Sequence, residues 1–390
     1  RNGRRNMKIL YYTWNENSRD DMLETLKILG HEVIICDTPC RDYEQDAEVM
    51  SSLKGVIRKQ EVDCMFSFNF FPVIARAAEQ YGIKYISWVY DCPHWTLFSP
   101  AVKSAYNYIF VFDLQQYEQL KVLGVQRCFH FPLAVNTTRL ARMGKEAAKK
   151  AGCPDVSFVG SLYENNLYDR INYLPEYVRG YLSGIMEAQE RIYGYNFVSE
   201  LLTDEMIGQM DRYISMEMPQ GYHVTKRELY AEMINGKITS RERMRLLQEL
   251  SERFPLTLYT ASDASRLPGV KLGGTVDYVT EMPRVFRDSR INLNISLRSI
   301  RSGIPLRALD IMGAGGFLMS NYQPELAEYF EDGKELAMYG SAEELIDKTA
   351  YYLSHEEERR QIAKAGFGKV QELFSYEVRV TQMLDLVTIA

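Results

Sequence analysis

The sequence predicts an α/β protein of two doubly wound domains, with a helical insertion in the second domain. Three observations lead to this prediction. The chain has 390 residues, which is too long for one ordinary domain. Short apolar runs alternate with helical patterns at both ends of the chain, as they do in parallel sheets covered by helices. From about 165 to 250 only helical periodicity is found, with many Tyr and Met residues.

Composition and charge exclude several classes of function. The apolar and charged fractions are typical of a soluble globular protein. A net charge of −6 argues against nucleic-acid binding, and no apolar run is long enough for a transmembrane segment. Most of the 6 cysteines lie in or beside apolar runs, which indicates reduced thiols in a cytoplasmic protein. They include no C-x-x-C pair, which argues against a metal site among them.

The first domain is expected over 7–140. Met7–Tyr12 is a predicted strand, and the amphipathic helix after it ends at Gly30, before a second strand. Further strands are expected at 64–68, 83–89 and 108–112. The order of strand, helix and strand predicts an open parallel sheet. The polar loop 13–19 lacks G-x-G-x-x-G, which argues against a nicotinamide or flavin domain.

The segment 87–95 leaves the carboxyl end of the strand predicted at 83–89, which is where open α/β sheets bind ligands. Asp91 and His94 are expected to take part in general acid–base catalysis or to hold a sugar hydroxyl. Three aromatic residues are expected to offer flat apolar surface to a sugar ring: Trp88, Tyr90 and Trp95. The structural alternative is that Asp91 caps a turn before Pro93 and that the aromatic side chains belong to the core.

The second domain is expected over 151–374 and begins with a strand that ends at Gly160 and Ser161. These two residues are predicted to bring backbone N–H groups close to a phosphate, with a plain turn as the alternative. The insertion, about 165–250, is predicted to contain helices at 172–193, 196–213 and 227–234. It would serve an acceptor cleft, a lid or a contact between copies in a homo-oligomer, and the sequence does not choose among these.

The densest chemistry lies in 299–320, between two predicted strands. Gly303 permits unusual backbone angles, and Pro305 suits the first turn of a short helix. Free N–H groups at such a helix start favour an anion. Arg307 and Asp310 are three residues apart and share one helix face, so they would suit a diphosphate and a ribose diol. The alternative is a buried helix with an Arg–Asp surface pair.

These segments resemble the glycosyltransferases of the GT-B fold, specifically the spore-maturation CgeB-like group. The matching segments are 302–320, 325–335 and 339–345. The segment 85–94, together with 110–113 and 131–136, is similar to the uncharacterised domain that often precedes this group. The resemblance implies two Rossmann-like domains, with the nucleotide-sugar held mainly by the second. It also implies that a last helix, 375–390, crosses back to the first domain.

The resemblance also implies roles for single residues. Asp310 falls where such enzymes place an acidic residue, usually Glu, on the ribose hydroxyls. Arg301 and Arg307 match the phosphate-facing position, and Ser302 and Gly303 would supply backbone N–H groups. Many retaining members carry a second Glu eight residues before the ribose acid, where this chain has Ser302, so the stereochemistry stays open. The absence of Asp-x-Asp fits diphosphate binding without an obligatory metal.

The expected function is metal-independent transfer of a hexosyl or N-acetylhexosaminyl group from a nucleotide-sugar, preferably a UDP-sugar, to a carbohydrate or protein hydroxyl. No cofactor is expected. If the reaction inverts configuration, Asp91 or His94 would take the acceptor proton, and if it retains configuration the same residues would bind the acceptor. Two alternatives are a nucleotide-sugar epimerase with the same donor site and a non-catalytic sugar- or nucleotide-binding protein.

Overall fold

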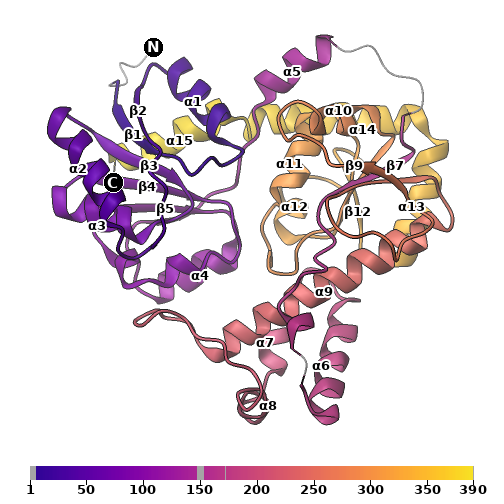
Figure 1. Cartoon of the computed structure of the whole chain (residues 1–390). Helices are drawn as coiled ribbons and strands as arrows, with labels where there is room; N and C mark the ends of the chain where they lie inside the picture. The colour runs from indigo at the N-terminus through magenta and orange to yellow at the C-terminus, as the bar shows by residue number, and fades with distance from the viewer. Residues whose placement is uncertain (1–5, 147–152, 172, 390) are drawn as a thin grey trace. The chain divides into compact units, whose positions relative to one another are not determined.

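The computed structural model describes residues 6–146, 153–171 and 173–389 (Figure 1). The chain divides into two compact units. The first unit comprises the residues up to Ala134, the short segment Pro219–His223 and the residues from Leu373 onward. The second unit comprises Val135–Met218 and Val224–Glu372. Each unit is built on one parallel sheet, so the predicted pair of doubly wound sheets is confirmed.

The sheet of the first unit has the strand order β2-β1-β3-β4-β5-β6. Its strands are β1 (Lys8–Tyr12), β2 (Glu32–Cys36), β3 (Cys64–Phe68), β4 (Lys84–Val89), β5 (Asn107–Val111) and β6 (Cys128–His130). After β1 the chain forms β2 on one side of β1, and it then returns to form β3 on the other side. The strand order therefore reverses between β1 and β3, and such a switch point opens a crevice at the carboxyl ends of the strands.

Helices cover both faces of this sheet. They are α1 (Arg19–Ile28), α2 (Ala47–Lys59), α3 (Pro72–Tyr81), α4 (Leu114–Val122) and α15 (Tyr376–Ile389), with 3-10 turns η1 (Trp95–Phe98) and η2 (Pro100–Lys103). Strands β3 and β5 are buried along their whole length, as expected for parallel strands covered on both faces. The last helix, α15, packs against α1, and the Lys84 ammonium donates a 2.6 Å hydrogen bond to the Val387 carbonyl. The C-terminal helix thus completes the first unit.

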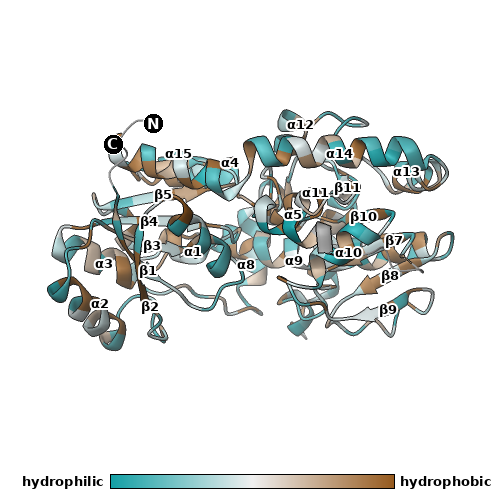
Figure 2. Cartoon of the chain, turned by 90° about the horizontal axis from the view of Figure 1, so that it is seen from above, coloured by the Kyte–Doolittle hydropathy of each residue, from teal (hydrophilic) through white to brown (hydrophobic). Residues whose placement is uncertain are grey.

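The sheet of the second unit has the order β12-β11-β10-β7-β8-β9, which reverses between β7 and β10. Its strands are β7 (Val156–Val159), β8 (Leu256–Tyr259), β9 (Lys271–Gly274), β10 (Ile291–Asn294), β11 (Leu318–Asn321) and β12 (Ala337–Tyr339). The helices outside the insertion are α5 (Thr137–Glu146), α10 (Met282–Asp288), α11 (Leu306–Gly313), α12 (Pro324–Tyr329), α13 (Ala342–Ser354) and α14 (Glu356–Leu373). Both hydrophilic and hydrophobic residues occur along α13 and α14, which is typical of helices that cover a sheet (Figure 2).

The predicted helical insertion lies between β7 and β8 and has its own apolar core. Its elements are the 3-10 turn η3 (Tyr168–Arg170) and the helices α6 (Glu176–Gln189), α7 (Val198–Leu201), α8 (Asp204–Met210) and α9 (Lys226–Ser251). Two sequence predictions were wrong in detail. The helix expected at 196–213 is broken where the Thr203 hydroxyl caps α8, and the helix expected at 227–234 continues to Ser251. The Asn235–Gly236 pair favours a break, but buried apolar residues beyond it, such as Ile238 and Leu246, hold the helix together.

None of the helices in the described part of the chain combines the length and the apolar composition needed to cross a bilayer. All six cysteines are free thiols.

Candidate functional site

Two loops flank the switch point of the second sheet. One follows β7 and begins at Gly160, and the other follows β10 and runs from Ile295 to Pro305. Both leave the carboxyl ends of neighbouring parallel strands, since β7 pairs directly with β10. Ligands of open α/β sheets bind at this position. The predicted donor residues lie in these two loops or on α11, the helix that follows the second loop: Gly160, Ser161, Arg301, Ser302, Gly303, Arg307 and Asp310.

The helix that follows the second loop begins one residue later than the sequence suggested. Pro305 is the N-cap of α11, with an extended backbone (φ −62°, ψ 140°), and the first helical residue is Leu306. The prediction that Pro305 lies in the first turn was therefore wrong by one position. A proline here still fits, because its nitrogen carries no hydrogen to leave unpaired. The helix start follows directly after the loop at the switch point.

Arg307 and Asp310 form the pair that their spacing predicts. The Arg307 Nη1 atom lies 3.6 Å from Asp310 Oδ2, and the Tyr278 hydroxyl donates a 3.1 Å hydrogen bond to Asp310 Oδ1. The guanidinium group lies over the Phe286 ring, 5.5 Å from its centroid. Asp310 is only 6% exposed. The pair is thus partly buried and fixed by its neighbours, unlike a solvated surface pair.

The loop before α11 is held by buried polar contacts. The Ser302 hydroxyl donates a 2.8 Å hydrogen bond to Glu325 Oε1, and the Ser302 carbonyl accepts one from the Glu325 N–H at 3.1 Å. Both side chains are buried, as is Gly303, whereas Arg301 is half-buried. Ser302 is therefore anchored to the start of α12, and the adjacent Arg301 is more open to solvent.

The predicted phosphate contact through Gly160 does not fit the structure. The Gly160 N–H donates a 3.1 Å hydrogen bond to the Tyr259 carbonyl, so the sheet already uses it. Ser161 is exposed, and its hydroxyl accepts a 3.0 Å hydrogen bond from the Tyr163 N–H. The glycine continues the strand pairing, and the loop turns only at the serine.

Arg243, on α9, was missed by sequence reasoning and connects the two loops of the switch point. Its guanidinium donates 2.6 Å hydrogen bonds to the Ser161 and Ile295 carbonyls. It lies over the rings of Phe158 and Tyr163, at 5.3 Å from each centroid. Burial lowers the pKa of Arg243 to about 10, so it remains a cation at neutral pH. Because Arg243 is distant in sequence from both loops, no local sequence pattern indicates this role.

The first unit has a second cluster at its own switch point, in the loops after β1, β3 and β4. Trp14 stacks on Tyr90, with ring centroids 6.1 Å apart, and its indole N–H donates to the Phe68 carbonyl at 3.3 Å. The Asn69 amide donates a 2.7 Å hydrogen bond to Asp91 Oδ2, and its oxygen accepts from the Tyr90 N–H at 3.2 Å. Asp91 is exposed, and Trp14 is 41% exposed. This cluster places an oriented carboxylate beside aromatic surface.

The other predicted residues of this segment serve packing. Trp88 is 1% exposed, and its indole is surrounded by Phe68, Phe131 and Tyr376 at centroid distances of 5.7, 5.8 and 5.9 Å. Trp88 therefore presents no face to a sugar, and the expected acceptor contact is corrected to a core position. Trp95 is half-buried and packs against Phe98, at 6.1 Å between centroids.

His94 is likewise tied to the backbone. Its Nε2 atom lies 3.1 Å from both the N–H nitrogen and the carbonyl oxygen of Phe70. Burial lowers the pKa of the imidazole, against the opposing influence of Phe70 and Asp91, so the ring is neutral at pH 7. Since its Nε2 atom is used by the chain, His94 is better suited to hold the loop than to take a substrate proton. Asp91 is the better-placed base of the two.

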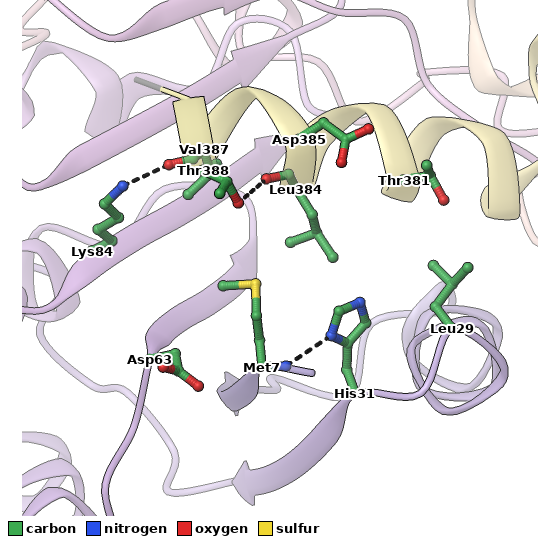
Figure 3. Close-up of a pocket in the computed structure, with 10 residues that line it drawn as sticks. All are labelled: Met7, Leu29, His31, Asp63, Lys84, Thr381, Leu384, Asp385, Val387 and Thr388. Carbon is green, nitrogen blue, oxygen red and sulfur yellow. Dashed lines mark hydrogen bonds between the residues drawn. The ribbon is translucent and has the colours of Figure 1, made fainter. Parts of the chain in front are cut away.

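A cavity of about 470 Å³ lies at the opposite end of the first sheet, beneath α15 (Figure 3). Its residues come from the amino ends of the strands and from the last helix. They include His31, whose Nδ1 accepts a 3.2 Å hydrogen bond from the Met7 N–H, and Lys84, which bonds to the Val387 carbonyl. The amino ends of parallel strands are not where open α/β sheets bind substrates. We therefore interpret this cavity as a space left where α15 packs against the first sheet, and not as a substrate site.

Comparisons with known proteins agree with this architecture. Residues 241–385 match the model of a family described as glycosyl transferase-like. No curated protein matches the chain in sequence. Among solved structures, the chain is similar to sucrose-phosphate synthase from Thermosynechococcus elongatus, with 11% identity, a TM-score of 0.57 and 98% of each chain covered.

Two further structures show the same similarity. A glycosyltransferase from Rickettsia africae has 12% identity and a TM-score of 0.53, with 98% of each chain covered. HepE from Anabaena, in complex with UDP and glucose, has 9% identity and a TM-score of 0.53, with 98% of this chain and 100% of the other covered. At these identities the likeness establishes the fold alone. The chain has the GT-B fold, and its C-terminal part, residues 241–385, matches the glycosyl transferase-like family.

Proposed function

We propose that the protein is a glycosyltransferase that moves a sugar from a nucleoside-diphosphate donor, preferably a UDP-sugar, to a hydroxyl of a carbohydrate or protein acceptor. The observation that carries the proposal is the fixed Arg307–Asp310 pair beside the switch point of the second sheet. The family match over 241–385 includes this pair. HepE, a protein of the same fold, is solved with UDP-glucose. Membership of the CgeB-like group, a cytoplasmic location and independence from metal belong to the same proposal.

The donor would lie across the loop after β10 and the start of α11. Departure of the sugar builds negative charge on the diphosphate. The start of α11 and the cations Arg301 and Arg307 would stabilise that charge without a metal. Asp310 would accept hydrogen bonds from the ribose diol, with Tyr278 and Arg307 fixing its orientation.

The acceptor would bind to the first unit. Asp91 is exposed and is oriented by Asn69, so its free oxygen would take the proton of the attacking hydroxyl in an inverting reaction. Tyr90, with Trp14 stacked on it, would contact the acceptor through its apolar surface. In a retaining reaction Asp91 would instead bind the acceptor. Product analysis with donor alone separates transfer from epimerisation, because an epimerase changes the donor without an acceptor.

Substitution of Asp310 tests the donor site. Asp310→Ala is expected to weaken UDP binding by about 10- to 100-fold, because hydrogen bonds to a charged group contribute about 1.5–3 kcal/mol. Calorimetric titration with UDP, with and without magnesium, gives the affinity. Asp310→Asn keeps the shape of the side chain and separates the charge from the packing.

The matched control is Asp347→Ala, which removes an exposed carboxylate from α13 and should leave UDP binding unchanged. Equal UDP affinity of the Asp310 variants and the wild type would contradict the assigned role of Asp310. Failure of the wild type to bind any nucleoside diphosphate would contradict the proposed function.

A further inference from the structure

The helical insertion contacts the loop that carries the proposed donor site. One face of α9 supplies the contacts, through residues spaced three and four apart. The Thr239 hydroxyl accepts a 3.0 Å hydrogen bond from the Arg298 N–H. The Asn196 amide, from the segment before α7, donates to the Arg298 carbonyl at 3.0 Å and to Asn235 Oδ1 at 2.9 Å. The insertion therefore fixes the first residues of the loop.

A buried ion pair completes this anchor. Glu242 receives two hydrogen bonds from the Arg298 guanidinium, at 2.8 and 2.9 Å, and one from the Tyr193 hydroxyl at 2.5 Å. The guanidinium also lies 4.5 Å from the centre of the Tyr193 ring. Both charges of this pair are therefore buried and compensated by each other.

Glu232 lies on the same face of α9, further toward the site. Its carboxylate accepts a hydrogen bond from the Ser299 hydroxyl and is close enough to Arg301 to be influenced by its charge. The described groups that act on it are Ser299 and Arg301 from the loop and Asn235 from its own helix. Burial raises the pKa of Glu232 to about 7, against the lowering influence of these three groups. A carboxylate with this pKa changes charge at physiological pH.

We propose that Glu232 is a positioning residue of the donor site, which holds Ser299 while the site is empty and takes up a proton from solvent when a nucleoside diphosphate binds. The inference rests on the proposed function, since it assigns the diphosphate to this loop. A diphosphate beside Arg301 competes for that cation and repels the Glu232 carboxylate, and both effects favour the protonated form.

The pH dependence follows from this competition. Below pH 7 Glu232 is mostly neutral and does not compete with the phosphates for Arg301. Above pH 7 the carboxylate is ionised, so UDP binding must also drive its protonation. The affinity for UDP is therefore expected to fall as the pH rises through 7, in addition to any change caused by titration of UDP itself.

The test compares UDP binding to the wild type, Glu232→Gln and the control Glu249→Gln by calorimetry at pH 6 and pH 8.5, in buffers of different ionisation enthalpy. Glu249 is on the same helix and pairs with Arg245, so its substitution makes the same charge change away from the loop. UDP titrates equally in all three experiments, so the comparison between proteins removes its contribution.

At pH 8.5 Glu232→Gln is expected to bind UDP about 3- to 10-fold more tightly than the wild type. At pH 6 the two proteins should bind UDP equally well. This difference corresponds to a rise of about half to one unit in the pKa of Glu232 when UDP binds to the wild type. The wild type and Glu249→Gln should take up protons on binding near pH 7, and Glu232→Gln should lack this uptake. A merely structural role would not change proton uptake.

Two outcomes would overturn the inference, and they can be told apart. If the wild type binds UDP but Glu232→Gln has the same pH dependence and proton uptake, Glu232 does not respond to the donor, and the proposed function stands without it. If the wild type binds no UDP, the proposed function fails and the inference fails with it.

Discussion

Replacing Asp91 with Asn is expected to slow glycosyl transfer by about 10²- to 10⁴-fold while UDP affinity stays unchanged, because general base catalysis contributes this much and an amide cannot accept the proton. The replacement keeps the shape of the side chain, and one of its two terminal atoms still faces Asn69. Initial rates of sugar transfer at saturating donor and acceptor measure the effect, and calorimetry with UDP measures donor binding.

Asp37→Asn is the matched control for this experiment. Asp37 is an exposed carboxylate that follows β2, at the same edge of the same sheet, but β2 lies on the far side of β1 from the switch point. Its substitution should leave the rate unchanged. A rate for Asp91→Asn within a factor of about three of the wild type would rule out Asp91 as the base and would favour the retaining reaction, in which it only binds the acceptor.

The sheets were predictable because their strands carry strong local signals. Ile9–Tyr11 is a short apolar run, and 291–296 alternates apolar and polar residues; each forms a strand in the structure. The insertion was harder to predict, since Asn235 and Gly236 favour a break in the middle of α9. Packing of the residues on both sides outweighs the cost of about 1 kcal/mol for a glycine inside a helix.

The site was predictable where its residues are neighbours in sequence. The Arg307–Asp310 pair follows from helical spacing alone. Arg243 and Glu232 act on loops that are distant in sequence, so only the folded chain shows their role. Trp88 was assigned to the acceptor because the segment 87–95 leaves the carboxyl end of a strand, but a central parallel strand is covered on both faces and buries its aromatic residues.

Trp14 is the residue for which the sequence did hold a signal. It follows the first strand of a doubly wound sheet, next to the point where strand order reverses, and polar loops at that position commonly contact ligands. The loop 13–19 was considered only for the G-x-G-x-x-G motif that it lacks. An exposed tryptophan there is a better indicator of an apolar ligand surface than Trp88, which lies inside a strand.

The Glu242–Arg298 pair carries the largest expected effect on stability. Glu242→Gln is expected to lower the free energy of unfolding by about 3–5 kcal/mol, because it leaves the Arg298 guanidinium buried without its counter-charge. Urea unfolding followed by far-UV circular dichroism gives this difference. Glu249→Gln breaks a pair of the same type on the same helix where the side chains are more exposed, and it should cost no more than about 0.5 kcal/mol.

The double variant Glu242→Met, Arg298→Met tests whether the ion pair contributes to stability alone or also to UDP binding. Two apolar side chains of similar size leave no unpaired charge, so stability is expected to recover to within about 2 kcal/mol of the wild type. The double variant should nevertheless bind UDP more weakly than the wild type, because only Asn196 and Thr239 would then hold the backbone of residue 298, without the side-chain anchor. If the double variant instead bound UDP as well as the wild type, the ion pair would serve only the stability of the unit, and the loop would be positioned by the backbone contacts alone.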